Sequence, residues 1–255
     1  KYQEGSGMKT FRLLRLDHLV IDTEDLPGAL DFYAKLPGVR IFVEKGRGVA
    51  RIGQQKINIH QYPPTLSPVA LHPATGHQVF CLEYAGIPEP FQEYFLRTAA
   101  GKAAAGIGEF FVKDPDGNRI GIGCGRSFPG HLPRIECLAL LASDMEASLR
   151  FYSDMLGMEV VPSDNGCLCK LGMGTIRLVA KSDELVGGAG DFCLITDTDI
   201  EAVLRELAGA PLVPGLGIVR RQGALGPMRS VYLRDPEGNL VEIAEYERGE
   251  KRMLA

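Results

Sequence analysis

Apolar residues in the N-terminal part of the chain follow first a strand pattern and then a helical one. Residues Arg15–Thr23 are apolar and β-branched at their centre, as in a buried strand. Apolar side chains then recur at helical spacing from Leu26 to Tyr33, and Gly38 follows where a helix would end. Three short segments with strand character come next: Arg40–Glu44, Val49–Ile52 and Lys56–His60. The pattern predicts a βαβββ module.

The same pattern returns later in the chain. The segment RLDHLVIDTEDLPGALDFYAKLPGVRIF begins at Arg15 and aligns without a gap with RIECLALLASDMEASLRFYSDMLGMEVV, which begins at Arg134, an offset of 119 residues. Downstream, DPDGN at residues 114–118 matches DPEGN at residues 235–239, an offset of 121 residues. A repeat of this extent indicates that the chain is a duplication of a unit of about 120 residues.

Each copy contains a second strand and helix start, at His77–Tyr84 and at Asp191–Thr196. In the second copy one helical face follows, formed by Ile200, Val203, Leu204 and Leu207. The DPDGN and DPEGN segments predict hairpin turns before the last strands, because Asp-Gly and Gly-Asn tolerate positive φ angles. Ser143 and Glu146 form a capping-box pattern ahead of the third helix. The sequence therefore predicts four βαβββ modules and an α+β fold.

Segments between the repeats divide the chain further. Residues 1–7 precede Met8 and resemble a remnant of recombinant expression, and GRSFPGHLP at residues 125–133 resembles a linker. The predicted units are the remnant at residues 1–7, a first two-module domain at 8–124, the linker at 125–133, a second two-module domain at 134–246 and a C-terminal tail at 247–255.

Composition and charge narrow the range of functions. Apolar residues make up 45% and charged residues 24% of the 255 residues, as in an ordinary globular protein. The net charge of −4 gives no reason to expect a nucleic acid or an anionic membrane as a partner. Neither a signal peptide nor an apolar run of about 18 residues is found, so we expect a cytoplasmic protein.

The six cysteines are expected to be reduced. They include no CxxC pair and no spacing typical of small secreted domains. Cys81 and Cys193 each lie in an apolar run, where a free thiol behaves as a small hydrophobic residue. A metal-binding or redox pair formed by Cys167 and Cys169 is the alternative.

Three segments, taken with the four-fold module, resemble a known superfamily. They are DHLVIDTEDLPGALDFY, INIHQ and RRQGALGPMRSVYLRDPEGNLVEI. The resemblance is to the vicinal oxygen chelate superfamily, which includes glyoxalase I, extradiol dioxygenases, fosfomycin resistance proteins and bleomycin-binding proteins. It extends from Arg15 to Tyr246 and implies a tandem, two-domain glyoxalase-like protein whose four modules form two curved-sheet cups. Because this fold hosts several reactions, the resemblance does not by itself select one.

In that superfamily the first and last strands of each module provide metal ligands that point into the cup. The corresponding positions in modules one to four are His18 and Asn58, His77 and Gly121, Cys137 and Arg177, and a position near Ala189 with Glu242. His60 lies two residues beyond Asn58 and therefore on the same strand face. Neither copy alone provides a good ligand set, and Arg177 would repel a divalent cation.

A better site results when the modules pair crosswise, the first with the fourth and the second with the third. The first and fourth modules together supply His18, Glu242 and either His60 or Asn58. Two imidazoles and a carboxylate suit Fe²⁺, Mn²⁺, Ni²⁺ or Zn²⁺. We therefore predict one divalent metal ion per chain, held by His18, His60 and Glu242, and no recognisable site in the other pair of modules.

These ligands favour a metal-dependent enzyme that acts on a small, oxygen-rich substrate. The metal would bind two substrate oxygens as a Lewis acid, and Glu242, a ligand and also the catalytic residue, would move the proton. Isomerase or lyase chemistry needs only this, whereas dioxygenase chemistry needs Fe²⁺ on two histidines and a glutamate. Glutathione-dependent glyoxalase I is disfavoured, because no module pair supplies two carboxylates. The alternative is a non-catalytic small-molecule-binding protein of the bleomycin-resistance type.

A basic segment precedes the strand that pairs with the Glu242 strand. Within VRRQGALGPMR, residues Arg220, Arg221 and Arg229 are candidates to hold a carboxylate or phosphate of the substrate by bidentate hydrogen bonds. The alternative is a solvated loop whose glycines permit a turn. We expect a small-molecule substrate as the partner, and a chain that is either a monomer with an internal pseudo-dimer or a homodimer.

Overall fold

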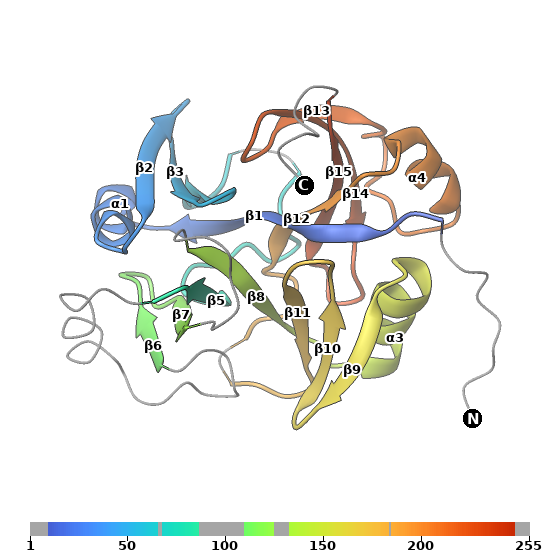
Figure 1. Cartoon of the computed structure of the whole chain (residues 1–255), viewed down its shortest axis with the longest axis horizontal. Coiled ribbons are helices and arrows are strands. Elements are labelled where there is room, and N and C mark those ends of the chain that lie inside the picture. Colours follow the sequence, from blue (N-terminus) through green and yellow to red (C-terminus); the bar gives the residue numbers. More distant parts are fainter. Residues whose placement is uncertain (1–9, 66–67, 87–109, 125–132, 184, 248–255) are drawn as a thin grey trace.

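The computed structural model describes residues 10–65, 68–86, 110–124, 133–183 and 185–247, which Figure 1 shows in colour. The first module comprises β1 (Leu13–Thr23), α1 (Leu26–Ala34), β2 (Val39–Glu44), β3 (Arg47–Ile52) and β4 (Gln55–Gln61). The described part of the second module comprises β5 (Val79–Tyr84), β6 (Phe110–Lys113) and β7 (Arg119–Cys124).

The second half of the chain repeats this order. The third module comprises β8 (Arg134–Leu141), α3 (Met145–Leu149), the π-helical turn η2 (Arg150–Met155), β9 (Glu159–Ser163), β10 (Gly166–Lys170) and β11 (Thr175–Val179). The fourth comprises β12 (Asp191–Thr196), α4 (Ile200–Glu206), β13 (Val219–Gln222), β14 (Pro227–Arg234) and β15 (Leu240–Tyr246). The predicted strands begin and end within two residues of these bounds. The predicted helix of the second module, the remnant and almost all of the linker and tail lie outside the described residues.

The start of the third helix differs from the prediction. Asp144, and not Ser143, is the N-cap, and its side chain accepts a hydrogen bond from the backbone N–H of Ala147. Ser143 instead donates from its backbone N–H and its hydroxyl to the carboxylate of Glu237, both at 2.6 Å. The predicted capping box is therefore wrong, because a contact with the fourth module engages Ser143.

The strands form two sheets, and each sheet takes its strands from both halves of the chain. The eight-stranded sheet has the order β13-β14-β15-β12-β1-β4-β3-β2, and the seven-stranded sheet has the order β6-β7-β5-β8-β11-β10-β9. The first module thus pairs with the fourth and the second with the third, which is the predicted crosswise arrangement. Both sheets are mixed and curved, as Figure 1 shows, and the fold is α+β of the glyoxalase-like type. We call the concave sides of the eight-stranded and seven-stranded sheets the first and second cup.

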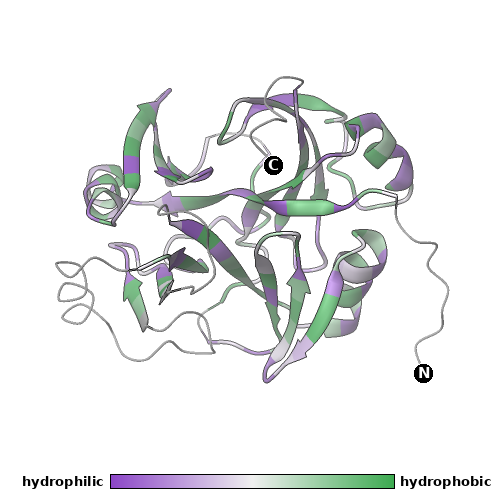
Figure 2. Cartoon of the chain, viewed as in Figure 1, coloured by the Kyte–Doolittle hydropathy of each residue, from purple (hydrophilic) through white to green (hydrophobic). Residues whose placement is uncertain are grey.

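Side chains on opposite faces of each strand have different surroundings. Leu19 and Ile21 of β1 are buried in one core that also contains residues of the other sheet and of the helices, such as Phe80 and Tyr152. His18 and Val20, which alternate with them along the strand, face the first cup. Figure 2 shows this mixture of apolar and hydrophilic residues along the strands. The period of two along a strand therefore separates the core from the cups.

The DPDGN and DPEGN segments form the predicted turns and also connect the two halves of each sequence copy. Asp114 accepts hydrogen bonds from the backbone of its own turn and from the hydroxyl of Tyr33 on α1, at 3.0 Å. Asp235 does the same in the second copy, with Tyr152 of η2 at 2.8 Å. Because α1 follows β1 of one sheet whereas Asp114 follows β6 of the other, each tyrosine links the two sheets.

Two other sequence-based expectations concern the whole chain. The five cysteines whose side chains are described form no disulfide with one another. In the described part of the chain, no helix combines the length and the apolar composition that crossing a membrane requires.

Candidate functional site

The first cup contains a pocket with a volume of about 240 Å³. Its walls come from the first and fourth modules, which the crosswise pairing brings together. Residues that point into it from the four central strands are His18 and Val20 of β1, Lys56, Asn58 and His60 of β4, Asp191 of β12, and Leu240 and Glu242 of β15. The three predicted metal ligands therefore line one pocket.

Strand register places His18 and Glu242 in one row across the sheet. His18 of β1 lies opposite Cys193 of β12, and Cys193 lies opposite Glu242 of β15. Neighbours in such a row point to the same side of the sheet. The Nε2 atom of His18 lies 3.5 Å from Oε2 of Glu242, and the side chains are 6% and 4% exposed. Both groups are thus withdrawn from solvent and face each other.

His60 lies further along the cup than His18 does. In the parallel pairing of β1 with β4, His18 is opposite Lys56, Val20 is opposite Asn58, and Asp22 is opposite His60. Four residues of a strand span roughly 13 Å, so the backbone of Asn58 is closer to the His18 row than that of His60. Both alternatives that the sequence left open, Asn58 and His60, line the pocket.

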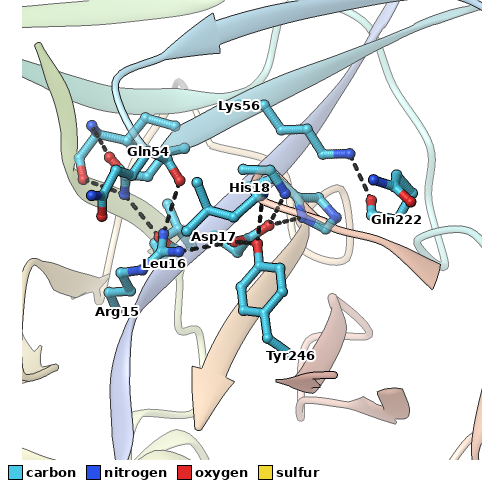
Figure 3. Close-up of polar contacts among 12 residues, drawn as sticks. Arg15, Leu16, Asp17, His18, Gln54, Lys56, Gln222 and Tyr246 are labelled. Carbon is cyan, nitrogen blue, oxygen red and sulfur yellow. Dashed lines mark hydrogen bonds and ion pairs between the residues drawn. The ribbon is translucent and has the colours of Figure 1, made fainter. Parts of the chain in front are cut away.

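Buried hydrogen bonds fix the orientation of the His18 ring. The Nδ1 atom of His18 lies 3.0 Å from Oδ2 of Asp17, which also accepts from the backbone N–H of Ala224 at 2.9 Å. The hydroxyl of Tyr246 donates to the other oxygen of Asp17, and Arg15 lies 3.3 Å from it. Figure 3 shows these groups converging on Asp17. Because Nδ1 is engaged with a carboxylate, Nε2 is the atom that faces the pocket.

The same contacts shift the pKa values of both partners. Burial alone would raise the pKa of Asp17, but the hydrogen bond and charge of His18, with Arg15 and Tyr246, hold it at about 2. Burial would lower the pKa of His18, but its hydrogen bonds to Asp17 and Glu242 outweigh this and raise the pKa to about 9. Without a metal ion, His18 is therefore an imidazolium between two carboxylates.

His60 has the opposite tendency. Burial, followed by the positive charges of Arg47, His18 and Lys56, lowers the pKa of His60 to about 4. The ring is consequently neutral near pH 7 and its nitrogen lone pair is available. Its Nε2 atom is buried and has no hydrogen-bond partner among the described residues.

Asp191 is a pocket residue that the sequence analysis did not identify. The fourth module's first-strand position was expected near Ala189, without a ligand, whereas the structure places Asp191, two residues later, in the pocket wall. Burial raises the pKa of Asp191 to about 7, with an opposing contribution from His18. The signal was available: Phe192-Cys193-Leu194 repeats Phe80-Cys81-Leu82, which fixes where the strand begins.

Asp191 gives the first cup a second carboxyl. Two carboxylates were not expected from any module pair, yet Asp191 and Glu242 line the same pocket. The donor set of the first cup is therefore two imidazoles, two carboxyls and the Asn58 amide. Glu242 Oε1, like His60 Nε2, is buried without a hydrogen-bond partner among the residues that the structure describes. Unpartnered nitrogen and oxygen donors in one pocket fit a divalent transition-metal ion.

A tighter cluster lies beneath the pocket. Potential ligand atoms of Asp17, His18 and Cys193 lie within 4.8 Å of one another. Both oxygens of Asp17 already accept hydrogen bonds, and Cys193 is fully buried with a pKa that burial raises well above its usual value. The donors that remain available are those facing the pocket.

Only one of the three predicted arginines lines this pocket. Arg221 does so, and its Nε donates to the hydroxyl of Tyr232 at 3.0 Å. Arg220, the next residue on β13, is exposed and its Nε lies 3.1 Å from Glu247. Arg229 lies near α4, where it is bound to carboxylates. Arg220 and Arg229 instead line a separate surface depression.

Sequence comparisons match the second copy to a known superfamily and align just under half of the chain with individual relatives. Residues 134–243 match the profile of the Glyoxalase/Bleomycin resistance protein/Dioxygenase superfamily. The chain is 36% identical to the virulence protein STM3117 of Salmonella typhimurium over 123 residues, which cover 45% of this chain and 85% of that protein. It is 34% identical over 114 residues to the glyoxalase domain-containing protein RDO1 of Mycosarcoma maydis, which cover 41% of this chain and 65% of that protein.

Nearly the whole chain matches the fold of a solved glyoxalase I structure. Glyoxalase I from Zea mays matches with a TM-score of 0.58 and 16% sequence identity, over 96% of this chain and 94% of that chain. At this identity the likeness concerns the fold alone. The sequence match at residues 134–243, the 36% identical relative and the shared fold lead to one conclusion. The chain belongs to the glyoxalase/bleomycin resistance protein/dioxygenase superfamily.

Proposed function

We propose that this chain is a divalent-metal-dependent enzyme that acts on a small substrate with two neighbouring oxygen atoms. The observation that carries the proposal is the facing pair of His18 Nε2 and Glu242 Oε2, 3.5 Å apart in a pocket that holds further unpartnered donors. We assign His18 and Glu242 as ligands, with Asp191 and either His60 or Asn58 completing the set. When bound, the ion supplies Lewis-acid polarisation of the two substrate oxygens.

The protein's own groups have separate tasks in this proposal. Asp17 accepts from Nδ1 of His18 and so directs the Nε2 lone pair into the pocket. Glu242 faces His18 through Oε2, which leaves Oε1 without a partner among the described residues. We infer that Oε1 of Glu242 takes a proton from the substrate carbon next to an oxygen and returns it to the neighbouring carbon. That transfer, with the hydroxyl proton passing to the neighbouring oxygen, is an isomerase-type reaction.

The donor set favours this reaction type over ring cleavage by a dioxygenase. Ring-cleaving chemistry needs Fe²⁺ on two histidines and one carboxylate. Here the backbone of the second histidine, His60, lies four residues along β4 from Lys56, which is the residue opposite His18. Asp191 adds a second carboxyl to the pocket. The alternative is a non-catalytic binder of the bleomycin-resistance type, which has no requirement for metal-ligating groups in its pocket.

Metal stoichiometry tests the site. The full chain is loaded separately with Fe²⁺, Mn²⁺, Ni²⁺ and Zn²⁺, and bound metal is measured by elemental analysis after desalting. We expect one ion per chain in the unsubstituted protein and none in His18→Ala. Glu159→Gln, an exposed carboxylate of β9 in the other sheet, is the matched control and should retain one ion. A chain that binds no ion under any of these conditions overturns the proposal.

Two measurements separate the reaction types. Proton transfer is followed as solvent-deuterium incorporation into a panel of 2-hydroxy and 2-oxo carbonyl compounds, and ring cleavage as oxygen uptake with catechols and the Fe²⁺ form. We expect incorporation that is lost in Glu242→Gln, and no oxygen uptake. Oxygen uptake in place of exchange would assign a dioxygenase, and tight binding of a panel compound without either reaction would assign the binder.

A further inference from the structure

Three cationic side chains line the pocket and have no task in the proposed metal site. They are Arg47 of β3, Lys56 of β4 and Arg221 of β13. Lys56 is the most deeply buried of them, with 5% of its surface exposed. Two acidic residues, Asp191 and Glu242, line the same pocket, so the cations outnumber the carboxyls before any metal ion is added.

Within the described parts of the chain, none of the three cations forms a salt bridge. Lys56 Nζ donates to the carbonyl oxygen of Gln222 at 2.8 Å, as Figure 3 shows. Arg221 Nε donates to the hydroxyl of Tyr232 at 3.0 Å. The guanidinium of Arg47 makes no hydrogen bond to another residue that the structure describes. Neutral acceptors position two of these groups, and all three lack an ion-pair partner among the described residues.

The other two arginines of the basic segment lie outside the pocket and are held differently. Arg229 Nη1 lies 2.6 Å from Glu201, and its Nη2 lies 2.8 Å from Glu245. Arg220, which precedes Arg221 on β13, pairs with Glu247 at 3.1 Å. The contrast between Arg220 and Arg221 is the sharpest, because adjacent residues of one strand have a carboxylate partner on one face and none on the other. Among the arginines of this segment, the charges of Arg220 and Arg229 are therefore neutralised outside the pocket, and that of Arg221 is retained inside it.

An uncompensated cation in a pocket with restricted access to water attracts an anion more strongly than one on an open surface. Keeping an ammonium group away from water is unfavourable, and burial lowers the pKa of Lys56 although the charges of Asp17 and Glu242 oppose this. A bound oxyanion removes this penalty. Guanidinium groups such as those of Arg47 and Arg221 match the two oxygens of a carboxylate or phosphate with parallel hydrogen bonds.

We propose that Arg47, Lys56 and Arg221 form an oxyanion subsite, and that the substrate is a small organic anion. Its carboxylate or phosphate group lies among the three cations, and its two neighbouring oxygens face His18 and Glu242. A pocket of about 240 Å³ limits the ligand to a small molecule. The inference rests on the proposed function for the position of the reacting oxygens, whereas anion binding by the three cations can be measured without turnover.

Calorimetric titration of the full chain with inorganic phosphate and with oxalate tests the subsite. We expect Lys56→Met and Arg221→Gln each to raise the Kd of the bound probe at least about tenfold. Arg220→Gln is the matched control on the same strand and should leave the Kd unchanged. Arg221 is only half-buried, so its substitution tests the proposal even if Lys56→Met fails to fold. Binding of phosphate alone identifies a phosphoryl group, and binding of oxalate alone identifies a carboxylate.

Titrations of both the metal-free and the metal-loaded protein keep this inference separate from the proposed function. If no ion binds but Lys56→Met and Arg221→Gln still weaken phosphate binding, the subsite stands and the proposed function fails. If the ion binds and both variants bind the probes as the unsubstituted chain does, the subsite is refuted. Failure of the unsubstituted chain to bind either probe, or equal affinity for uncharged ethylene glycol, also refutes it.

Discussion

The two cups have the same strand register and present different side chains. In the first cup, His18 lies opposite Cys193 on one side and Lys56 on the other. In the second cup, Cys137 lies opposite Cys81 and Thr175. The equivalent rows therefore read lysine–histidine–cysteine in one sheet and threonine–cysteine–cysteine in the other.

The difference continues along the rows. Cys193 is paired with Glu242 in the first cup, and its counterpart Cys81 is paired with Gly121 in the second. His18, Lys56 and Glu242 are thus replaced by smaller groups, and the second cup contains an apolar cluster of Cys81, Cys137, Ala139 and Val179. The position of Asn58 is taken by Arg177, which is also buried. Both sheets keep their apolar outer faces in the common core. Core packing therefore preserves the backbone of both cups, while the residues that face the cups are free to diverge.

Replacing Glu242 by glycine, the residue at the equivalent position of the second cup, should have the largest effect on metal binding. We expect Glu242→Gly to weaken metal binding by more than about 100-fold, because even the outer partners of metal ligands contribute 10–100-fold. Calorimetric titration with Mn²⁺ or Zn²⁺ measures the change. Cys137→Ala, at the position equivalent to His18, is the control and should bind one ion with unchanged affinity. Equal losses in the two variants would mean that the ion does not bind in the first cup.

Asp17 offers a finer comparison between the cups. It is fully buried and accepts from His18, whereas its equivalent Glu136 pairs with Arg134 in a partly exposed position. Asp17→Asn should lower metal affinity about 10–100-fold, since the ring of His18 loses the anion that orients it. Glu136→Gln should change it by less than about twofold. A metal affinity in Asp17→Asn equal to that of the unsubstituted chain would exclude an orienting role.

The scaffold, unlike the site, should respond alike in both copies. Tyr33→Phe and Tyr152→Phe each remove one buried hydrogen bond, to Asp114 and Asp235 respectively. We expect each to lower the free energy of unfolding by about 1–3 kcal/mol, with unchanged metal affinity. Urea denaturation in the presence of a chelator measures the loss. A large loss in one variant and none in the other would show that the two sheet-linking contacts are not equivalent.

Much of the fold could be predicted from the sequence because the core imposes the same apolar pattern on every module. The apolar, β-branched centre of Arg15–Thr23 and the helical spacing that follows reflect burial in the common core. The crosswise pairing could be inferred because neither copy alone supplies a good set of metal ligands, whereas His18 and Glu242 together do. These predictions depend on strand position alone, which a repeat determines well.

The parts that the sequence missed depend on exact register and on charge balance. Asp191 was overlooked because the ligand position of the fourth module was placed near Ala189, two residues before the strand that was itself predicted at Asp191–Thr196. Lys56 shares a strand face with Asn58, yet a lysine facing a cup and a lysine facing solvent give the same pattern. Arg220 and Arg221 could have been separated, because adjacent residues of a strand point to opposite faces.

Substitution of Arg229 should have the smallest effect, and it distinguishes an ion-paired arginine outside the pocket from Arg221, which lines the pocket. Arg229 binds Glu201 and Glu245 on the α4 side of the sheet and is 29% exposed, so a Gln there removes only partly solvated ion pairs. We expect Arg229→Gln to lower the free energy of unfolding by less than about 1 kcal/mol and to leave the affinities for metal and phosphate unchanged. Arg221→Gln should give the reverse, with weaker phosphate binding and little change in unfolding. Thermal denaturation and calorimetry on the two variants measure both quantities, and weaker phosphate binding in Arg229→Gln would extend the oxyanion subsite beyond the pocket.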